Sequence, residues 1–211
     1  MALRCYFAPG ASSLAGLVAL EAANAAYEPH RLVLAEGEHR REPYLAVNPR
    51  GRVPSLVLET GQVVSENIAI LTWIAHRYPD ARLLPFEDLG RLARAYELMS
   101  WFASSAHVAI AQIWRGERFT DDQAIKTALA DAGRRNVLSA LDDIETIAGE
   151  AGDWFLGERF SVIDPYALVF WRWAQRLEID TAAYPAWSAM TARALEHPAV
   201  KAALAREAAA G

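Results

Sequence analysis

Two kinds of hydrophobic pattern follow one another along this chain of 211 residues. Short apolar runs bounded by turn residues, which are typical of strands, occur only in the first part of the chain. Apolar residues spaced three and four apart, which are typical of helices, lie between these runs and fill the rest. The strand-like runs are residues 3–7, 31–34, 55–58 and 63–64, and the helical segments among them are residues 14–25, 42–47 and 65–78.

The order of these elements, β-α-β-α-β-β-α, resembles the thioredoxin fold. Two prolines and several loop residues follow, and beyond them no strand signal is convincing. Residues 89–114 and 121–147 have long helical patterns, and helical segments rich in Ala and Trp continue to the end. The predicted division is a thioredoxin-like α/β domain at residues 1–79, a linker at residues 80–88 and an all-helical domain at residues 89–211.

Composition and charge narrow the possible functions. The net charge of −5 argues against nucleic acid or an anionic membrane as the main partner. The single cysteine, Cys5, excludes an intrachain disulfide and a multi-cysteine zinc site, so we expect no metal and a reducing, cytoplasmic location. The apolar stretch at residues 166–171 ends at Arg172 and is too short to span a membrane.

Two segments of the first domain suggest a binding site. Pro54 follows Val53 at the first residue of a predicted strand, where a missing N–H is tolerated. If the bond between them is cis, the backbone N–H and C=O of Val53 are free to pair with an extended peptide ligand. Glu66 and Asn67 open a helix whose free N–H groups favour a carboxylate, and Glu66 could hold an ammonium. Alternatively, Ser65 caps this helix and Glu66 only complements its dipole.

Residues 53–56, Val-Pro-Ser-Leu, and residues 65–71, Ser-Glu-Asn-Ile-Ala-Ile-Leu, resemble the glutathione-binding core of the cytosolic glutathione transferase family. Asn67 stands where that family usually has Ser, but Asn can also donate to a carboxylate. A Ser-x-x-Asp capping box at residues 161–164 and the closing segments also match the family, so the resemblance covers nearly the whole chain. It implies an α/β N-terminal thioredoxin-like domain plus an all-α C-terminal domain, a homodimer, and glutathione as co-substrate.

The segment that joins the first strand to the first helix carries two hydroxyls, Ser12 and Ser13. Either serine can cap the helix, and a hydroxyl at a helix N-terminus can donate to an anion. Residues 7–14 are similar to the Ser-Pro-Gly-Ala-Cys-Ser-Leu segment of the bacterial beta class, with Ser12 in place of its cysteine. The resemblance implies that one serine faces the glutathione sulfur, and the choice between the two stays open. Cys5 is expected to face the core and take no part.

The resemblance implies roles for further positions. His107 aligns with a beta-class histidine near the glutathione sulfur, although the lysine that follows it in that class is Val108 here. Arg52 could pair with the glycyl carboxylate of glutathione, and His39 and Arg40 are rivals for that role. A lone histidine on a helix or an arginine in a turn is also common without any function.

The resemblance implies attack of the glutathione thiolate on a small, largely apolar electrophile. The expected catalytic residues are Ser12 and His107, and the expected glutathione-binding residues are Arg52, Val53, Pro54, Glu66 and Asn67. Trp101, Trp114 and Phe119 either form an aromatic wall for the electrophile or belong to the core. The alternatives are another glutathione chemistry, namely isomerisation, dehalogenation, ether cleavage or peroxide reduction, or a binding protein that has lost turnover.

Overall fold

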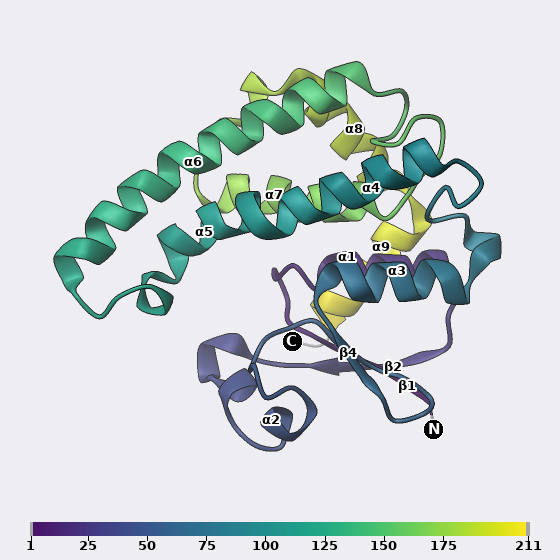
Figure 1. Ribbon diagram of the computed structural model, residues 1–211, viewed down its shortest axis with the longest axis horizontal. Helices are drawn as coiled ribbons and strands as arrows, with labels where there is room; N and C mark the ends of the chain where they lie inside the picture. Colours follow the sequence, from purple (N-terminus) through teal and green to yellow (C-terminus); the bar gives the residue numbers. More distant parts are fainter. Residues whose placement is uncertain (1, 210–211) are drawn as a thin grey trace.

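The computed structural model describes residues 2–209 and arranges them as an α/β layer packed against a layer of helices (Figure 1). Four strands form one mixed sheet in the order β2-β1-β3-β4. The inner strand β1 (Leu3–Phe7) pairs in parallel with β2 (Tyr27–Arg31) and antiparallel with β3 (Ser55–Val57). At the other edge, β4 (Val63–Ser65) pairs antiparallel with β3.

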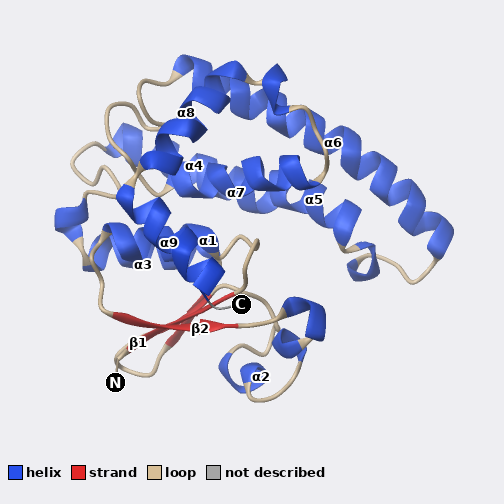
Figure 2. Ribbon diagram, turned by 180° about the vertical axis from the view of Figure 1, so that it is seen from behind, coloured by secondary structure: helices blue, strands red, loops and turns tan. Residues whose placement is uncertain are grey.

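The helices of the α/β layer cover both sides of this sheet. α1 (Leu14–Ala22) and α3 (Asn67–Arg77) lie between the sheet and the other helices, and the short α2 (Tyr44–Val47) lies on the opposite side (Figures 1 and 2). α1 is almost entirely buried, because it packs on α3 in its own layer and on α7 and α9 of the helical layer. The element order confirms the predicted β-α-β-α-β-β-α sequence.

The rest of the chain is helical, as predicted. Its helices are α4 (Leu89–Trp101), α5 (His107–Trp114), α6 (Gln123–Glu150), α7 (Ile163–Arg176), α8 (Pro185–Glu196) and α9 (Pro198–Ala209). A π-helical turn, η4 (Phe102–Ala106), joins α4 to α5, so the predicted helix at residues 89–114 is continuous but not regular. α7 buries eleven of its fourteen residues and contacts α1, α4 and α8.

The second strand lies four residues earlier than the predicted segment at residues 31–34, so that prediction is wrong. β2 has the polar sequence Tyr-Glu-Pro-His-Arg and pairs on one side only, with β1. An edge strand can carry polar side chains and a proline, because one row of its backbone groups needs no strand partner. The apolar signal came instead from Leu32, which is buried just after the strand and whose N–H donates to the Phe7 carbonyl at 2.8 Å.

The capping box at the start of α7 is only partly as predicted. The Asp164 carboxylate accepts from the Ser161 backbone N–H at 2.7 Å, as expected. The Ser161 hydroxyl accepts from Ile163 N–H at 3.2 Å rather than from Asp164 N–H. A contact that the sequence did not indicate, from Phe155 N–H to Asp164 at 3.0 Å, fixes the preceding loop.

The change from the α/β layer to the helical layer falls between α3 and α4. We therefore propose a first domain at residues 1–79, a linker at residues 80–88 and a second domain at residues 89–211.

Candidate functional site

The loop between β1 and α1 has one occupied hydroxyl and one available hydroxyl. The Ser13 Oγ accepts from the Ala8 N–H at 3.1 Å and donates to the Ala8 carbonyl at 3.2 Å, and Ser13 is fully buried. The Ser12 hydroxyl has no hydrogen-bond partner among residues 2–209, although only 4% of Ser12 is exposed. Neither side chain caps α1, so the capping prediction is wrong: Ser13 reaches back across its own loop instead.

Helices from the end of the chain hold this loop in place. Gly10 has a φ of +70°, a conformation that glycine adopts without strain. Its N–H donates to the Glu207 carboxylate of α9 at 3.3 Å, and its carbonyl accepts from the Trp173 indole of α7 at 2.9 Å. Glu207 is buried and also accepts from Arg172 at 2.8 Å. The position of Ser12, two residues beyond Gly10, therefore depends on the helical layer.

The segment before β3 also has unpaired backbone groups, and β3 lies beside β1, the strand that leads into the Ser12 loop. The peptide bond between Val53 and Pro54 is cis, which confirms the expectation. Neither backbone group of Val53 has a partner within the described part of the chain. The preceding carbonyl, that of Arg52, accepts from the Tyr44 hydroxyl at 2.6 Å and from the Asn48 amide at 2.8 Å. These two contacts fix the segment so that Val53 is available to a ligand.

Of the two interpretations of the start of α3, the Ser65 cap is wrong, and ligand binding by Glu66 and Asn67 stays a prediction. Ser65 belongs to β4, and its hydroxyl accepts from Arg50 at 3.3 Å rather than capping the helix. Glu66 is exposed and has a φ of +73°, which is unusual for a residue with a side chain. The Asn67 amide is buried and donates to the Ser12 carbonyl at 3.2 Å, while its Oδ1 is buried without a partner among residues 2–209. Asn67 thus links α3 directly to the loop that carries Ser12.

His107 begins α5 beside two tryptophans. Its ring meets Trp173 edge-on with centroids 4.9 Å apart, and Trp173 meets Trp114 edge-on at 5.9 Å. Burial, together with the positive charges of Arg118 and Arg52, lowers the pKa of His107 to about 4. His107 is therefore neutral near pH 7: it can donate or accept a hydrogen bond but adds no positive charge to the site.

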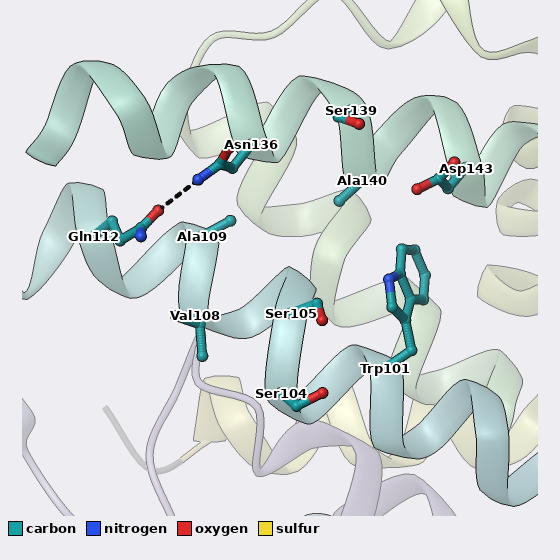
Figure 3. A pocket seen from close by; sticks show the side chains of 10 residues that line it. All are labelled: Trp101, Ser104, Ser105, Val108, Ala109, Gln112, Asn136, Ser139, Ala140 and Asp143. Atoms are coloured by element: carbon teal, nitrogen blue, oxygen red, sulfur yellow. Dashed lines mark hydrogen bonds between the residues drawn. The ribbon is translucent and has the colours of Figure 1, made fainter.

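The predicted aromatic wall is only partly assembled. Trp114 lies with Trp173 near His107, and Trp173 was not singled out in the sequence. Phe119 is half exposed after α5. Trp101 instead lines a separate groove of about 330 Å³ between the α4–α5 segment and α6 (Figure 3). The polar side chains along that groove include a Gln112–Asn136 pair, which is joined by a hydrogen bond of 3.0 Å.

Arg118 lies within electrostatic range of three other arginines, and two of the four, Arg118 and Arg52, also act on His107. We refer to Arg40, Arg52, Arg115 and Arg118 as the arginine cluster. Arg40 is ion-paired with Glu117 at 3.5 Å, which joins the loop after β2 to the turn after α5. Partial burial and the charges of Arg52, Arg115 and Arg40 lower the pKa of Arg118, and Glu117 only partly offsets them. The cluster thus has an excess of positive charge.

His39, one rival for the glycyl carboxylate, is poorly suited to that role. It is buried, and its Nδ1 has no partner in the described structure. Burial and the nearby charges of Arg40, Arg115 and Arg118 lower its pKa, so it is neutral at neutral pH. Arg52 and Arg40 remain the charged candidates.

Other kinds of site find no support among residues 2–209. No group of three or more His, Cys, Asp or Glu side chains is arranged there to hold a metal ion. No described helix is both long and apolar enough to cross a membrane. Cys5 is buried in β1, as predicted, and burial raises the pKa of its thiol to about 12.

Known proteins resemble this chain in both sequence and fold. Residues 13–77 match the family model described as Glutathione S-transferase, N-terminal domain. A glutathione transferase homolog from Sulfitobacter, crystallised with bound glutathione, is 34% identical over 97% of this chain and 98% of its own, with a TM-score of 0.92. This chain belongs to the glutathione transferase family.

Other members of the glutathione transferase family show how wide the comparison is. A bacterial beta class glutathione S-transferase from Sphingomonas chungbukensis is 32% identical over 97% of this chain and 98% of its own, with a TM-score of 0.81. Glutathione S-transferase GstA from Escherichia coli O157:H7 is 27% identical over 97% and 98% of the two chains. Maleylacetoacetate isomerase from Pseudomonas aeruginosa is 28% identical over 82% and 80%. The family fold is therefore established, whereas the relatives differ in their reactions.

Two features of this glutathione transferase site escaped the sequence analysis. The hold on Gly10 by Trp173 and Glu207 spans 163 and 197 positions of the chain, and no local pattern indicates it. Arg115 precedes a single 3₁₀ turn, η5 (Gly116–Arg118), and Arg118 is its last residue; their spacing could have suggested a basic patch.

Proposed function

We propose that this glutathione transferase activates the thiol of glutathione for attack on a small electrophile, with the Ser12 hydroxyl as the donor to the sulfur. The observation that carries the proposal is the contrast within one loop: Ser13 is occupied by Ala8, and Ser12 has no partner among the described residues. The neutral state of His107 favours the same view, because His107 cannot stabilise a thiolate by charge.

The tripeptide would be held by the groups around Ser12. The free N–H and C=O of Val53, next to Pro54, would pair with the cysteinyl backbone, as an added strand does. Glu66 would hold the γ-glutamyl ammonium, and the unpaired N–H groups at the start of α3 would bind the neighbouring carboxylate. Asn67 contributes mainly by position, since its amide already donates to Ser12. Arg52 would pair with the glycyl carboxylate.

A single hydroxyl accounts for most of the proposed thiol activation. A free thiol has a pKa of about 8.5, and lowering it by about two units requires roughly 2.7 kcal/mol of preferential thiolate binding. A hydrogen bond to a charged group contributes about 1.5–3 kcal/mol, so Ser12 could supply most of the shift. The thiolate would then form a C–S bond with the electrophile. In a substitution, the bond from carbon to the leaving group breaks and its electron pair departs with that group. In an addition, the π pair of the double bond moves to a conjugated carbonyl oxygen. A serine cannot form a mixed disulfide, so no covalent enzyme intermediate is expected.

Isomerisation is the second candidate. Maleylacetoacetate isomerase from Pseudomonas aeruginosa and maleylpyruvate isomerase from Ralstonia are 28% and 27% identical to this chain, similar to the relatives named as transferases. A thiolate that adds to a double bond and then leaves would isomerise it, using the same activated sulfur. A glutathione-binding protein without turnover is the remaining alternative.

The test compares Ser12→Ala with Ser13→Ala. Ultraviolet titration of bound glutathione gives the thiol pKa, calorimetry gives its affinity, and steady-state assays with several electrophiles give turnover. Ser12→Ala should raise the thiol pKa by about one to two units and slow turnover, with glutathione affinity nearly kept. Ser13→Ala should mainly reduce stability. If Ser12→Ala leaves the thiol pKa unchanged, the proposed role of Ser12 is wrong.

We also propose a homodimer and a cytoplasmic location, from the family resemblance. Light scattering at micromolar concentration should give twice the mass of the chain, 23.2 kDa each. A monomeric mass would contradict the homodimer.

A further inference from the structure

The arginine cluster has more positive charge than glutathione can use. Arg40 is paired with Glu117 at 3.5 Å, and the proposed function assigns Arg52 to the glycyl carboxylate. The guanidinium groups of Arg115 and Arg118 have no hydrogen-bond or ion-pair partner among residues 2–209. Like charges close together repel one another and a bound anion would offset that repulsion, so these two unpaired guanidinium groups favour an anionic ligand.

The cluster adjoins the reacting centre. The positive charge of Arg118 contributes to the lowered pKa of His107. The His107 ring contacts Trp173, and the Trp173 indole donates to the Gly10 carbonyl at 2.9 Å. Gly10 lies two residues before Ser12, so Arg118 is connected to the sulfur site through two packed rings. Trp173 also meets Trp114 edge-on, and the Arg176 guanidinium lies over the Trp114 ring, 4.8 Å from its centroid. An aromatic surface bordered by cations fits a small molecule with an apolar body and an acidic end.

We propose that Arg118, with Arg115 beside it, binds a carboxylate of the second substrate, so that the electrophile is a small organic anion rather than a neutral apolar molecule. This inference rests on the proposed function and specifies its substrate class. Arginine suits this role because its planar guanidinium binds a carboxylate in a bidentate manner. Fixing that end would place the electrophilic carbon relative to the thiolate and offset the repulsion between the two anions.

A matched pair of electrophiles tests this inference. Benzoylacrylic acid and its methyl ester have the same conjugated double bond, and only the acid is charged near pH 7. In both, the thiolate forms a C–S bond, the π pair moves to the conjugated carbonyl oxygen, and the resulting enolate takes a proton from water. The wild-type enzyme should prefer the acid in kcat/KM, after subtraction of the uncatalysed rate.

Arg118→Gln should lower kcat/KM for the acid by about ten- to a hundred-fold and leave the ester nearly unchanged. Arg118→Lys should recover part of the loss, since it keeps the charge but not the planar fork. Arg135→Gln is the matched control, because the substitution removes the same charge from a residue that is exposed on α6 and has no partner in the described structure. It should change neither substrate. Circular dichroism checks that each variant is folded.

Three outcomes would overturn the inference. The wild-type enzyme could prefer the ester, Arg118→Gln could reduce both substrates equally, or Arg118→Gln could weaken glutathione binding instead. The last result would assign Arg118 to the glycyl carboxylate. If neither compound is turned over, the proposed function fails, but the anion site is still tested by calorimetry with benzoylpropionic acid and its ester, which cannot react. Tighter binding of this acid that is lost in Arg118→Gln supports the site, and equal binding of both compounds refutes it.

Discussion

Glu207 offers a test of whether the last helix positions the loop before Ser12. Its carboxylate accepts from Gly10 N–H at 3.3 Å and from Arg172 at 2.8 Å, and its side chain is only 5% exposed. Glu207→Ala removes both contacts. It leaves the Gly10 N–H unpaired and the Arg172 guanidinium without its carboxylate; the Arg172 side chain is 32% exposed. We expect a loss of both stability and thiol activation.

The size of the effect follows from burial. Removing one partner of a fully buried ion pair costs about 3–5 kcal/mol, because the other charge stays buried and unpaired. Arg172 keeps part of its hydration, so a loss of about 2–4 kcal/mol in the free energy of unfolding is expected. For a chain of this size, each kcal/mol lowers Tm by about 2–4 °C.

Two variants separate the contributions. Glu207→Gln keeps an oxygen that can accept from Gly10 but loses the charge, so it should retain part of the stability. Glu196→Ala is the control, because Glu196 is exposed and its pair with Lys201 lies on the surface of the same helical layer. A surface pair contributes at most about 1 kcal/mol. Denaturation with urea gives the stability of each variant, and ultraviolet titration gives the pKa of bound glutathione.

Glu207→Ala should also raise the thiol pKa, because Gly10 would no longer be fixed relative to Ser12. If the variant loses stability but binds and activates glutathione as the wild type does, Glu207 is only structural. If Glu207→Ala is no less stable than Glu196→Ala, the buried ion pair does not hold the loop and the reasoning is wrong.

Three other measurements test individual residues. Glu66→Gln should weaken glutathione binding about ten- to a hundred-fold, because a charge-assisted contact contributes about 1.5–3 kcal/mol; unchanged affinity by calorimetry contradicts this. Because the pKa of His107 is about 4, kcat/KM of the wild type and of His107→Gln should depend on pH in parallel between about pH 5.5 and pH 8, and a step near pH 6.5 in the wild type alone would disagree. Burial raises the pKa of Asp164 to about 6, so the unfolded chain releases this proton at a lower pH than the folded chain does. Relative to Asp164→Asn, the wild type should therefore lose about 3 kcal/mol of stability between about pH 4 and pH 6 and keep this lower stability above pH 6. Parallel stability curves for the two proteins would refute this.

Much of the fold could be predicted because its signals are local. The turn and strand around Pro54, the order of the helices, and the absence of strands between residues 89 and 209 each depend on residues that are neighbours in sequence. The edge strand β2 was misplaced because its partner lies on one side only, and its polar residues carry no apolar signal. Burial of Cys5 followed from its place in an apolar strand.

The candidate site was predictable in its types of residue but not in its connections. The sequence indicated two hydroxyls in one loop, and either could have faced a ligand. Only the structure shows that Ser13 is occupied by Ala8, and that Asn67 donates to the Ser12 carbonyl 55 positions away. The charge of His107 was likewise undetermined, because its pKa depends on burial and on Arg118 and Arg52.

The sequence by itself determined the order of elements, the turn before Pro54, and the motifs that resemble the glutathione-binding core, because each is set by short-range backbone preferences. The tertiary structure decided which groups are free and which are paired. The Gly10 carbonyl accepts from Trp173, and the Gly10 N–H donates to Glu207; these two partners lie 163 and 197 positions away. Hydrogen bonds and charge–charge interactions depend on distance in space, and that distance is fixed only when the helical layer packs on α1.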